Sequence, residues 1–236
     1  MHPGFSNIKT IFFLLWLCLL CSCGQSDIEY FPLGAKKYWR YQMTYQTMDG
    51  TFKGVYAVEN LGQRKIDDEI IYVRQLLDGS YNYFQVDDKG LFLKSREKTV
   101  DFDTRHTDAG QYIFRYPLQA GTAWEDTVVS KALIKTGPPQ KTEFHIVTKV
   151  PVEVTIESMT DTVQVPAGTF ANCMRITVKG NTFTDAGNYV GKTIVRINET
   201  NWYAPGVGLV KSVHKESTKH KALDKGEIIL MLESYR

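Results

Sequence analysis

Residues 39–45 read Trp-Arg-Tyr-Gln-Met-Thr-Tyr, so that large side chains alternate with smaller polar ones. Successive side chains of a β-strand point to opposite faces of the sheet, and this alternation is typical of a strand with one buried face. The stretch therefore predicts a half-buried β-strand, and the same pattern recurs along most of the remaining chain.

Further runs of this kind are rich in Val, Ile, Thr, Tyr and Phe, the residues that strands favour, and Gly-, Asp- or Pro-containing turns separate them. Only residues 130–136 are expected to form as much as one turn of helix. We predict an all-β fold with little helix, an antiparallel meander that forms a curved sheet, a half-barrel or a sandwich. The runs are 54–58, 70–77, 81–86, 91–94, 143–157, 173–178, 192–203, 209–214 and 227–232.

The amino-terminal segment has the pattern of a lipoprotein signal peptide. Lys9 precedes an apolar run at residues 11–20, which is too short to span a bilayer, since a span takes about 20 residues. Leu20 and Ser22 then resemble the −3 and −1 positions of a bacterial lipobox, with Cys23 as the lipidated residue. The alternatives are an ordinary secreted protein cut near Ser22, or a buried helix.

These features divide the chain into a signal peptide (1–22), a lipid anchor with a short tether (23–30) and a single β domain (31–236). Pro32-Leu33 followed by Trp39 is echoed by Pro117-Leu118 followed by Trp124, which suggests two related halves, 31–115 and 116–236. The tether spans about 20 Å at most, so we expect the domain to lie at the membrane surface. Gly24 and Gln25 carry no acid, which favours the outer membrane over the inner one.

Composition excludes some partners and chemistries. The formal net charge of +2 provides no basic field for nucleic acid. Once the signal peptide is removed and Cys23 is acylated, Cys173 is the one remaining thiol, which rules out an intramolecular disulfide. Because Cys173 lies in an alternating stretch at residues 170–176, we expect a buried, inert side chain. No nucleotide-binding loop, Gly-x-Ser-x-Gly or His-Glu-x-x-His sequence occurs, so we expect no cofactor.

Two polar segments remain. Asp101, Asp103, His106 and Asp108 could ligate a divalent ion, although their spacing fits no known calcium loop and a solvated loop is the simpler interpretation. Residues 214–221 are expected to form a solvated polar tip before the last strand.

Two turns resemble those of a loose group of bacterial exported proteins and lipoproteins of unknown function. Residues 165–170 read Val-Pro-Ala-Gly-Thr-Phe, and residues 203–211 read Tyr-Ala-Pro-Gly-Val-Gly-Leu-Val-Lys. The resemblance implies a β-rich fold and no particular activity. A more distant resemblance is to the open β half-barrels that carry lipoproteins. In physical terms, we assign Pro166, Gly168, Pro205, Gly206 and Gly208 a structural role in tight turns, with a binding edge as the alternative.

The sequence thus favours a bacterial envelope lipoprotein that acts as a non-catalytic binding or structural module. Its partners would be the bilayer, through acylated Cys23, and an envelope protein or an apolar ligand. The alternatives are a carrier of an apolar ligand or lipid, because many Tyr side chains suit an apolar groove, or a metal-dependent hydrolase that uses residues 101–108.

The anchor can be tested directly. Mass spectrometry of the mature protein from a bacterial envelope should detect an acylated amino-terminal Cys23. An unmodified amino terminus, or release of the parent protein by a salt wash, would contradict the assignment.

Overall fold

The computed structural model describes residues 30–66, 68–97, 110–137 and 142–236. Its regular structure is almost entirely β-strand, with one four-residue helix, α2 (Gly187–Val190), and one 3₁₀ turn, η1 (Lys221–Leu223). The strands are β1 (Tyr38–Thr47), β2 (Gly50–Ile66), β3 (Glu69–Leu76), β4 (Tyr81–Asp87), β5 (Gly90–Glu97), β6 (Gln111–Arg115), β7 (Ala123–Val129), β8 (Ile134–Gly137), β9 (Thr142–His145), β10 (Lys149–Val165), β11 (Gly168–Asp185), β12 (Lys192–Ala204), β13 (Gly208–Ser217) and β14 (Lys225–Tyr235).

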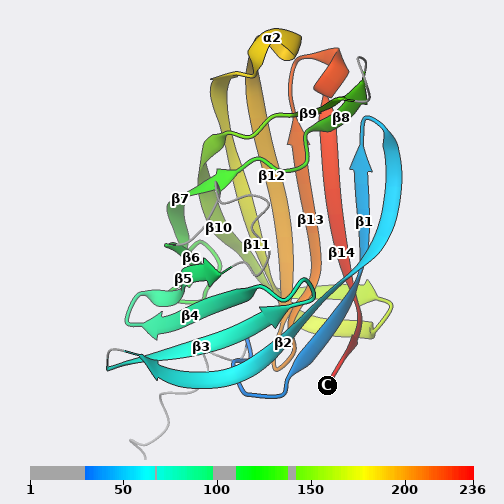
Figure 1. Ribbon diagram of the computed structural model, residues 1–236. Helices are drawn as coiled ribbons and strands as arrows, with labels where there is room; N and C mark the ends of the chain where they lie inside the picture. Colours follow the sequence, from blue (N-terminus) through cyan, green and yellow to red (C-terminus); the bar gives the residue numbers. More distant parts are fainter. Residues whose placement is uncertain (1–29, 67, 98–109, 138–141) are drawn as a thin grey trace, which may run out of the picture.

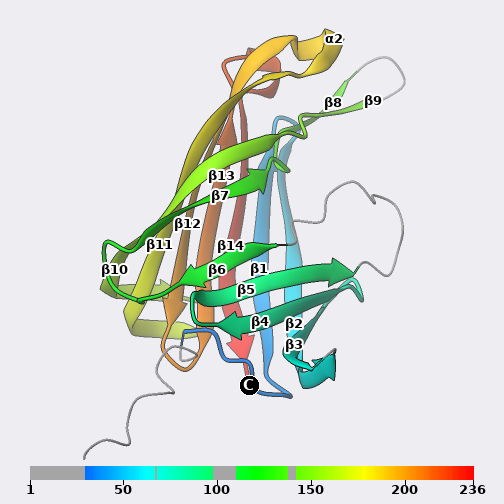
Figure 2. The ribbon, with the colours of Figure 1, turned by 90° about the vertical axis from the view of Figure 1, so that its left-hand side faces the viewer.

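Twelve strands form one sheet in the order β6-β5-β4-β3-β2-β1-β14-β13-β12-β11-β10-β7. Every ladder is antiparallel, and β1 joins the first and last parts of the chain by pairing with both β2 and β14. The sheet curls until its two edge strands, β6 and β7, approach each other, as Figures 1 and 2 show. No ladder joins these two edges within the described residues. The predicted curved antiparallel sheet is confirmed, and it is nearly closed into a barrel.

The segment after β7 crosses the interior of the curled sheet. We call residues Ser130–Leu133 the strap; its Ala132 and Leu133 are fully buried. A Cβ atom on Gly226 of β14 would lie 1.9 Å from the carbonyl oxygen of Ala132, so only glycine lets the strap pass this close. The strap leads into the β8–β9 hairpin, whose Thr136 amide donates to Asp49 at 2.7 Å. The helical turn expected at 130–136 is wrong, because this segment is tied to the sheet in an extended form.

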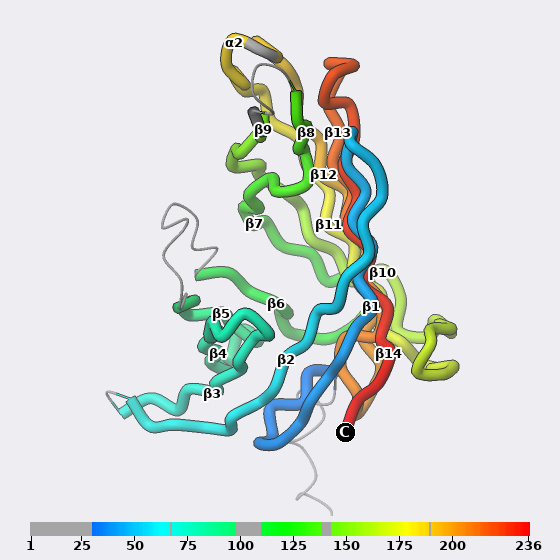
Figure 3. Tube along the Cα trace, turned by 45° about the vertical axis from the view of Figure 1, so that its right-hand side comes forward, coloured from blue at the N-terminus to red at the C-terminus, as the bar shows by residue number. Residues whose placement is uncertain are grey.

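Residues far apart in the chain meet at the two turns that carry the family resemblance, at residues 165–170 and 203–211. The Trp39 indole donates to the Val207 carbonyl at 2.6 Å, and the amide of Ala167 donates to the Leu232 carbonyl at 3.0 Å. Val163, Val165 and Cys173 of the β10–β11 hairpin share a buried cluster with Trp39. Both turns therefore pack at the same end of the sheet, where Figure 3 shows β1 and β14 running together and the hairpin crossing them.

A partly buried arginine holds the first described residues in place. The Arg74 guanidinium lies 4.1 Å from the Phe31 ring centroid and 4.8 Å from that of Trp39. Its Nη2 donates to the Pro32 carbonyl at 3.2 Å, and its Nε donates to the Asn60 side chain at 2.8 Å. Burial lowers the pKa of Arg74 to about 10. Aromatic faces and oxygen acceptors thus stabilise a cation that is removed from water.

Within the described part of the chain, no helix combines the length and apolar character that crossing a membrane would require.

Gly208 provides a test of this packing, because its φ of +95° is unfavourable for other residues and its Cβ position lies 3.3 Å from Pro32 Cδ. We expect Gly208→Ala to destabilise the mature protein in detergent micelles by about 1–3 kcal/mol, measured by urea unfolding. Gly168→Ala, at φ +133° with open space around it, isolates the backbone strain alone.

The matched control is Gly34→Ala, because its added Cβ meets nothing within 4 Å. Its effect should stay within about 0.5 kcal/mol or be slightly stabilising. Equal stability of the Gly208→Ala and Gly34→Ala variants would refute the structural role of this turn.

Candidate functional site

A cavity of about 190 Å³ lies where the two edges of the sheet fail to pair. Its walls come from β5 and β6 on one side, from β7 and the strap on the other, and from β10, β11 and β12 behind. The lining residues are Arg96, Gln111, Tyr112, Ile113, Asp126, Val128, Lys131, Val154, Ile176, Val178, Glu199, Asn201 and Tyr203. The incomplete closure of the barrel therefore leaves a recess that strands of both edges share.

The lining is mixed in chemistry. Positive charge comes from Arg96 and Lys131, and negative charge comes from Asp126 and Glu199. Side-chain amides add hydrogen-bonding groups, while valines and isoleucines form much of the remaining wall. The recess is smaller than the roughly 300–1,000 Å³ of pockets that hold drug-sized ligands. Its size and charges suit a small polar molecule.

A buried imidazole lies between two carboxylates at the back of this cavity. The His214 Nδ1 atom lies 2.6 Å from Glu199 Oε2, and its Nε2 lies 2.7 Å from Glu216 Oε1. Glu199 and His214 are directly opposite each other on β12 and β13. The side chains of His214 and Glu216 are 3% and 0% exposed, whereas Glu199 is 20% exposed. We call these three residues the triad.

The triad also holds the strap. Glu216 Oε1 accepts the amide of Lys131 at 2.7 Å, and its Oε2 accepts the amide of Ala132 at 3.0 Å. The Tyr45 hydroxyl donates to the Lys131 carbonyl at 3.3 Å. The backbone of Lys131 is thereby fixed, and its side chain lines the cavity beside Glu199. The triad therefore connects the cavity to the strap: Glu199 lines the cavity, Glu216 holds the strap, and His214 joins the two carboxylates.

A charged imidazole fits this geometry, because it donates from both ring nitrogens and each of them faces a carboxylate oxygen that can accept. Burial would lower the pKa of His214, but the hydrogen bonds from its ring to Glu199 and Glu216 outweigh burial and raise it. Burial would also raise the pKa of Glu199. The His214 hydrogen bond, the nearby charge of Lys131 and the Asn201 amide, which donates at 2.6 Å, instead lower that pKa to about 2.

Comparison with known proteins assigns a family. Residues 83–222, more than half of the chain, match the DUF3108-like family. This chain belongs to the DUF3108-like family. The matched region includes the strap and all three triad residues.

Two crystal structures resemble this DUF3108-like protein, each at 14% identity. One is a provisionally assigned exported protein of Bacteroides fragilis with a YmcC-like fold, which matches 87% of this chain and 98% of its own at a TM-score of 0.38. The other is a provisionally assigned lipoprotein of Parabacteroides distasonis, which matches 88% of this chain and 98% of its own at a TM-score of 0.35. Likenesses this weak establish nothing about function. No curated protein matches the chain.

The metal candidates Asp101, Asp103, His106 and Asp108, like Cys23, lie outside the described residues. Among the residues that the structure does describe, no group of three or more His, Cys, Asp or Glu side chains is arranged to hold a metal ion. Burial raises the pKa of the Cys173 thiol to about 11, which disfavours the nucleophilic thiolate.

The predicted turn residues lie away from the cavity. Pro166 joins β10 to β11 just before Gly168, whereas Pro205 and Gly206 lie between β12 and β13 just before Gly208. Gly206 has a positive φ of +71°, in line with its position in a tight turn.

The solvated polar tip expected at 214–221 is wrong. Strand β13 continues to Ser217, and His214 and Glu216 are buried on its inner face. The signal was present as period-2 alternation, since Val210, Ser212, His214 and Glu216 are all inward-facing positions. Their polarity concealed the pattern, because a polar side chain on a core face looks like surface until its partner on another strand is known.

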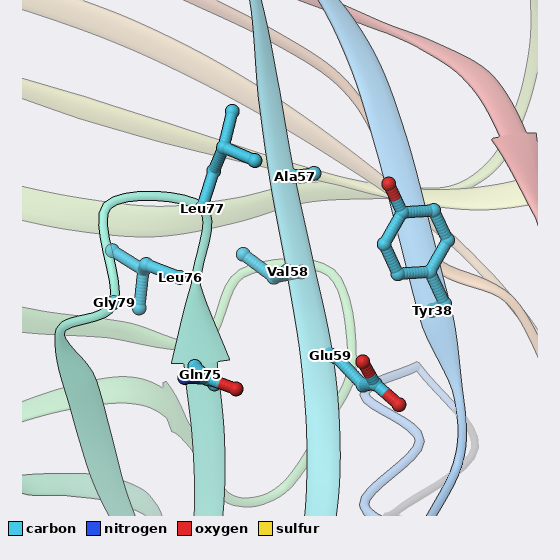
Figure 4. A pocket seen from close by; sticks show the side chains of 8 residues that line it. All are labelled: Tyr38, Ala57, Val58, Glu59, Gln75, Leu76, Leu77 and Gly79. Carbon is cyan, nitrogen blue, oxygen red and sulfur yellow. The ribbon is translucent and has the colours of Figure 1, made fainter.

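A second recess, of about 240 Å³, lies between β2 and the β3–β4 turn. Figure 4 shows Leu76 at the end of β3 and Leu77 on the turn that follows, next to Val58 on β2, with Tyr38 on the neighbouring strand. Leu77 is 64% exposed. Glu59 is the one residue with a formal charge among those that line this recess, which lacks the paired charges of the cavity.

The triad predicts a pH dependence of stability. A raised His214 pKa stabilises the fold below the ordinary value of 6.5, and this contribution is lost as the pH rises through the folded-state pKa. The lowered Glu199 pKa stabilises it above 4.5, and that contribution is lost as the pH falls towards 2. The triad therefore contributes most between pH 4.5 and pH 6.5.

The free energy of unfolding is measured in urea at one pH below and one pH above the pKa of His214. We expect it to be about 1.5–3 kcal/mol larger at the lower pH. Glu199→Gln should reduce this difference, whereas Glu233→Gln, which breaks an exposed pair with Arg40, should leave it intact. A pH difference that Glu199→Gln leaves unchanged would rule out the triad as its source.

Proposed function

We propose that this DUF3108-like protein is a lipid-anchored protein of the bacterial envelope that binds a small polar solute in its cavity without transforming it. The anchor is acylated Cys23, and the outer membrane is the favoured site because no acid follows it at Gly24 or Gln25. Two or three acyl chains suffice for stable attachment. An envelope protein as a further partner remains a prediction of the sequence.

The observation that carries the binding proposal is the convergence of both charge signs on one recess. Arg96 comes from β5, next to one edge strand, Asp126 comes from the other edge strand, β7, and Glu199 comes from the back wall. A solute with groups of both charge signs, such as an amino acid, would satisfy this lining, whereas a ligand of one sign would be repelled by half of it. Neutral solutes such as sugars are a weaker match, because they carry no charge to complement the charged side chains of this lining.

The carrier alternative fits this recess less well. An acyl chain requires a long apolar lining, whereas this recess is small and carries charged side chains such as Arg96 and Asp126. The hydrolase alternative depends on residues 101–108, which lie outside the described residues, and nothing in the cavity supports it. Both ring nitrogens of His214 already contact carboxylates, so this imidazole is not free to act as a general base.

The test is a binding screen on the mature protein in detergent micelles, with glycine, glutamate, lysine, glucose and octanoate as probes. Chemical shifts of the cavity-lining side chains should respond to at least one zwitterionic amino acid, and Arg96→Gln and Asp126→Asn should each weaken its binding at least tenfold.

Lys53→Gln on β2 is the control, because this exposed lysine lies outside the cavity lining. Binding of octanoate alone would instead support the carrier alternative. The absence of any response to all five probes would contradict the proposal.

A further inference from the structure

The two carboxylates of the triad differ in burial. This difference decides which of them separates from His214 when the imidazolium loses a proton. Glu216 is completely buried, and its two oxygens accept three hydrogen bonds, one from His214 and two from the strap amides. Glu199 is partly exposed and borders the cavity. Of the two carboxylates, only Glu199 has space into which its side chain can move.

The charged groups around His214 come from several elements. Glu199 lies on β12, Glu216 lies on β13 itself, and Lys131 lies on the strap. Strand β14 places uncharged Ile228 opposite His214. Tyr45 of β1 contacts the strap, and its pKa is raised to about 12, chiefly by burial, so this phenol stays neutral at ordinary pH.

Loss of one proton from the imidazolium to water leaves a single N–H on the ring, and one ring nitrogen then presents a lone pair to a carboxylate oxygen. A lone pair on Nε2 would face Glu216, which cannot retreat. A lone pair on Nδ1 would face Glu199, which can turn into the cavity, where water solvates it. The proton therefore stays on Nε2, and the charge of the triad changes from −1 to −2.

We propose that His214 is a proton-operated switch that sets the position of Glu199 in the cavity. With His214 protonated, Glu199 is withdrawn against the wall; with His214 neutral, its carboxylate turns inward and adds a free anion beside Lys131. The strap stays attached to Glu216 in both states. The switch does not require the proposed ligand, but through it the pH would control which charges a ligand meets.

The experiment is a pH titration of the mature protein in detergent micelles by NMR, with no ligand present. The side-chain amide of Asn201, which donates to Glu199 Oε1, reports the position of Glu199. The backbone amides of Lys131 and Ala132 report Glu216. We expect the Asn201 side-chain signals to follow a single one-proton titration with a midpoint above pH 6.5, while the two strap amides barely respond.

Glu199→Gln should abolish the Asn201 response, because no carboxylate then moves. Glu227→Gln, which alters a carboxylate paired with Lys215 at 3.0 Å on the adjacent strand, should leave it unchanged. If Glu199→Gln does not fold, the parent titration still decides. Strap amides that titrate with His214 while Asn201 does not would show that Glu216 is the residue released. That result, or no titration of Asn201 between about pH 5 and pH 9, would overturn the proposal.

Discussion

An imidazole fixed between two carboxylates inside the curled sheet is the interaction on which the site depends. Removing three ionisable groups from water is costly unless each is paired and hydrogen-bonded. Here both ring nitrogens of His214 are paired, and Glu216 accepts two further bonds from the strap. The same contacts fix one wall of the cavity. The triad is therefore part of the support of the site as well as part of its lining.

The fold accommodates another charge, the partly buried Arg74, in a different way. Arg74 is stabilised by the faces of Phe31 and Trp39 and by oxygen acceptors, and no carboxylate pairs with it among the ion pairs of the described residues. This cation ties the start of the domain to β3 at the end where the turns at residues 165–170 and 203–211 pack. The triad organises the cavity, and Arg74 organises the packing around Phe31 and Trp39.

The incomplete closure of the sheet connects these features. Strands β6 and β7 are the two edges, and the chain between them does not complete a ladder within the described residues. The short β6, of only five residues, limits what could pair there. The recess lies behind this gap between the two edges, so Glu199 lies between the buried His214 and the cavity. This position is the reason why we propose Glu199, and not Glu216, as the triad residue that moves.

Much of the sheet could be predicted from the sequence, because residues such as those at 39–45 alternate with period 2 and Gly-rich turns separate the runs. The site could not. Glu199 and His214 are 15 residues apart in sequence, and their contact depends on the β12–β13 register, which a bulge after Trp202 shifts. The extended form of the strap could not be predicted either, because its partners, Glu216 and Gly226, are more than 80 residues away. Non-local pairing of this kind leaves no local pattern.

The most direct test of the triad is the protonation state of His214 in the folded protein. Nitrogen-15 NMR of the imidazole ring at about pH 6 distinguishes a protonated ring nitrogen from a bare one. We predict that Nδ1 and Nε2 both carry protons, each in a hydrogen bond to a carboxylate. A neutral ring with one bare nitrogen at that pH would contradict the charged imidazole on which the site is built.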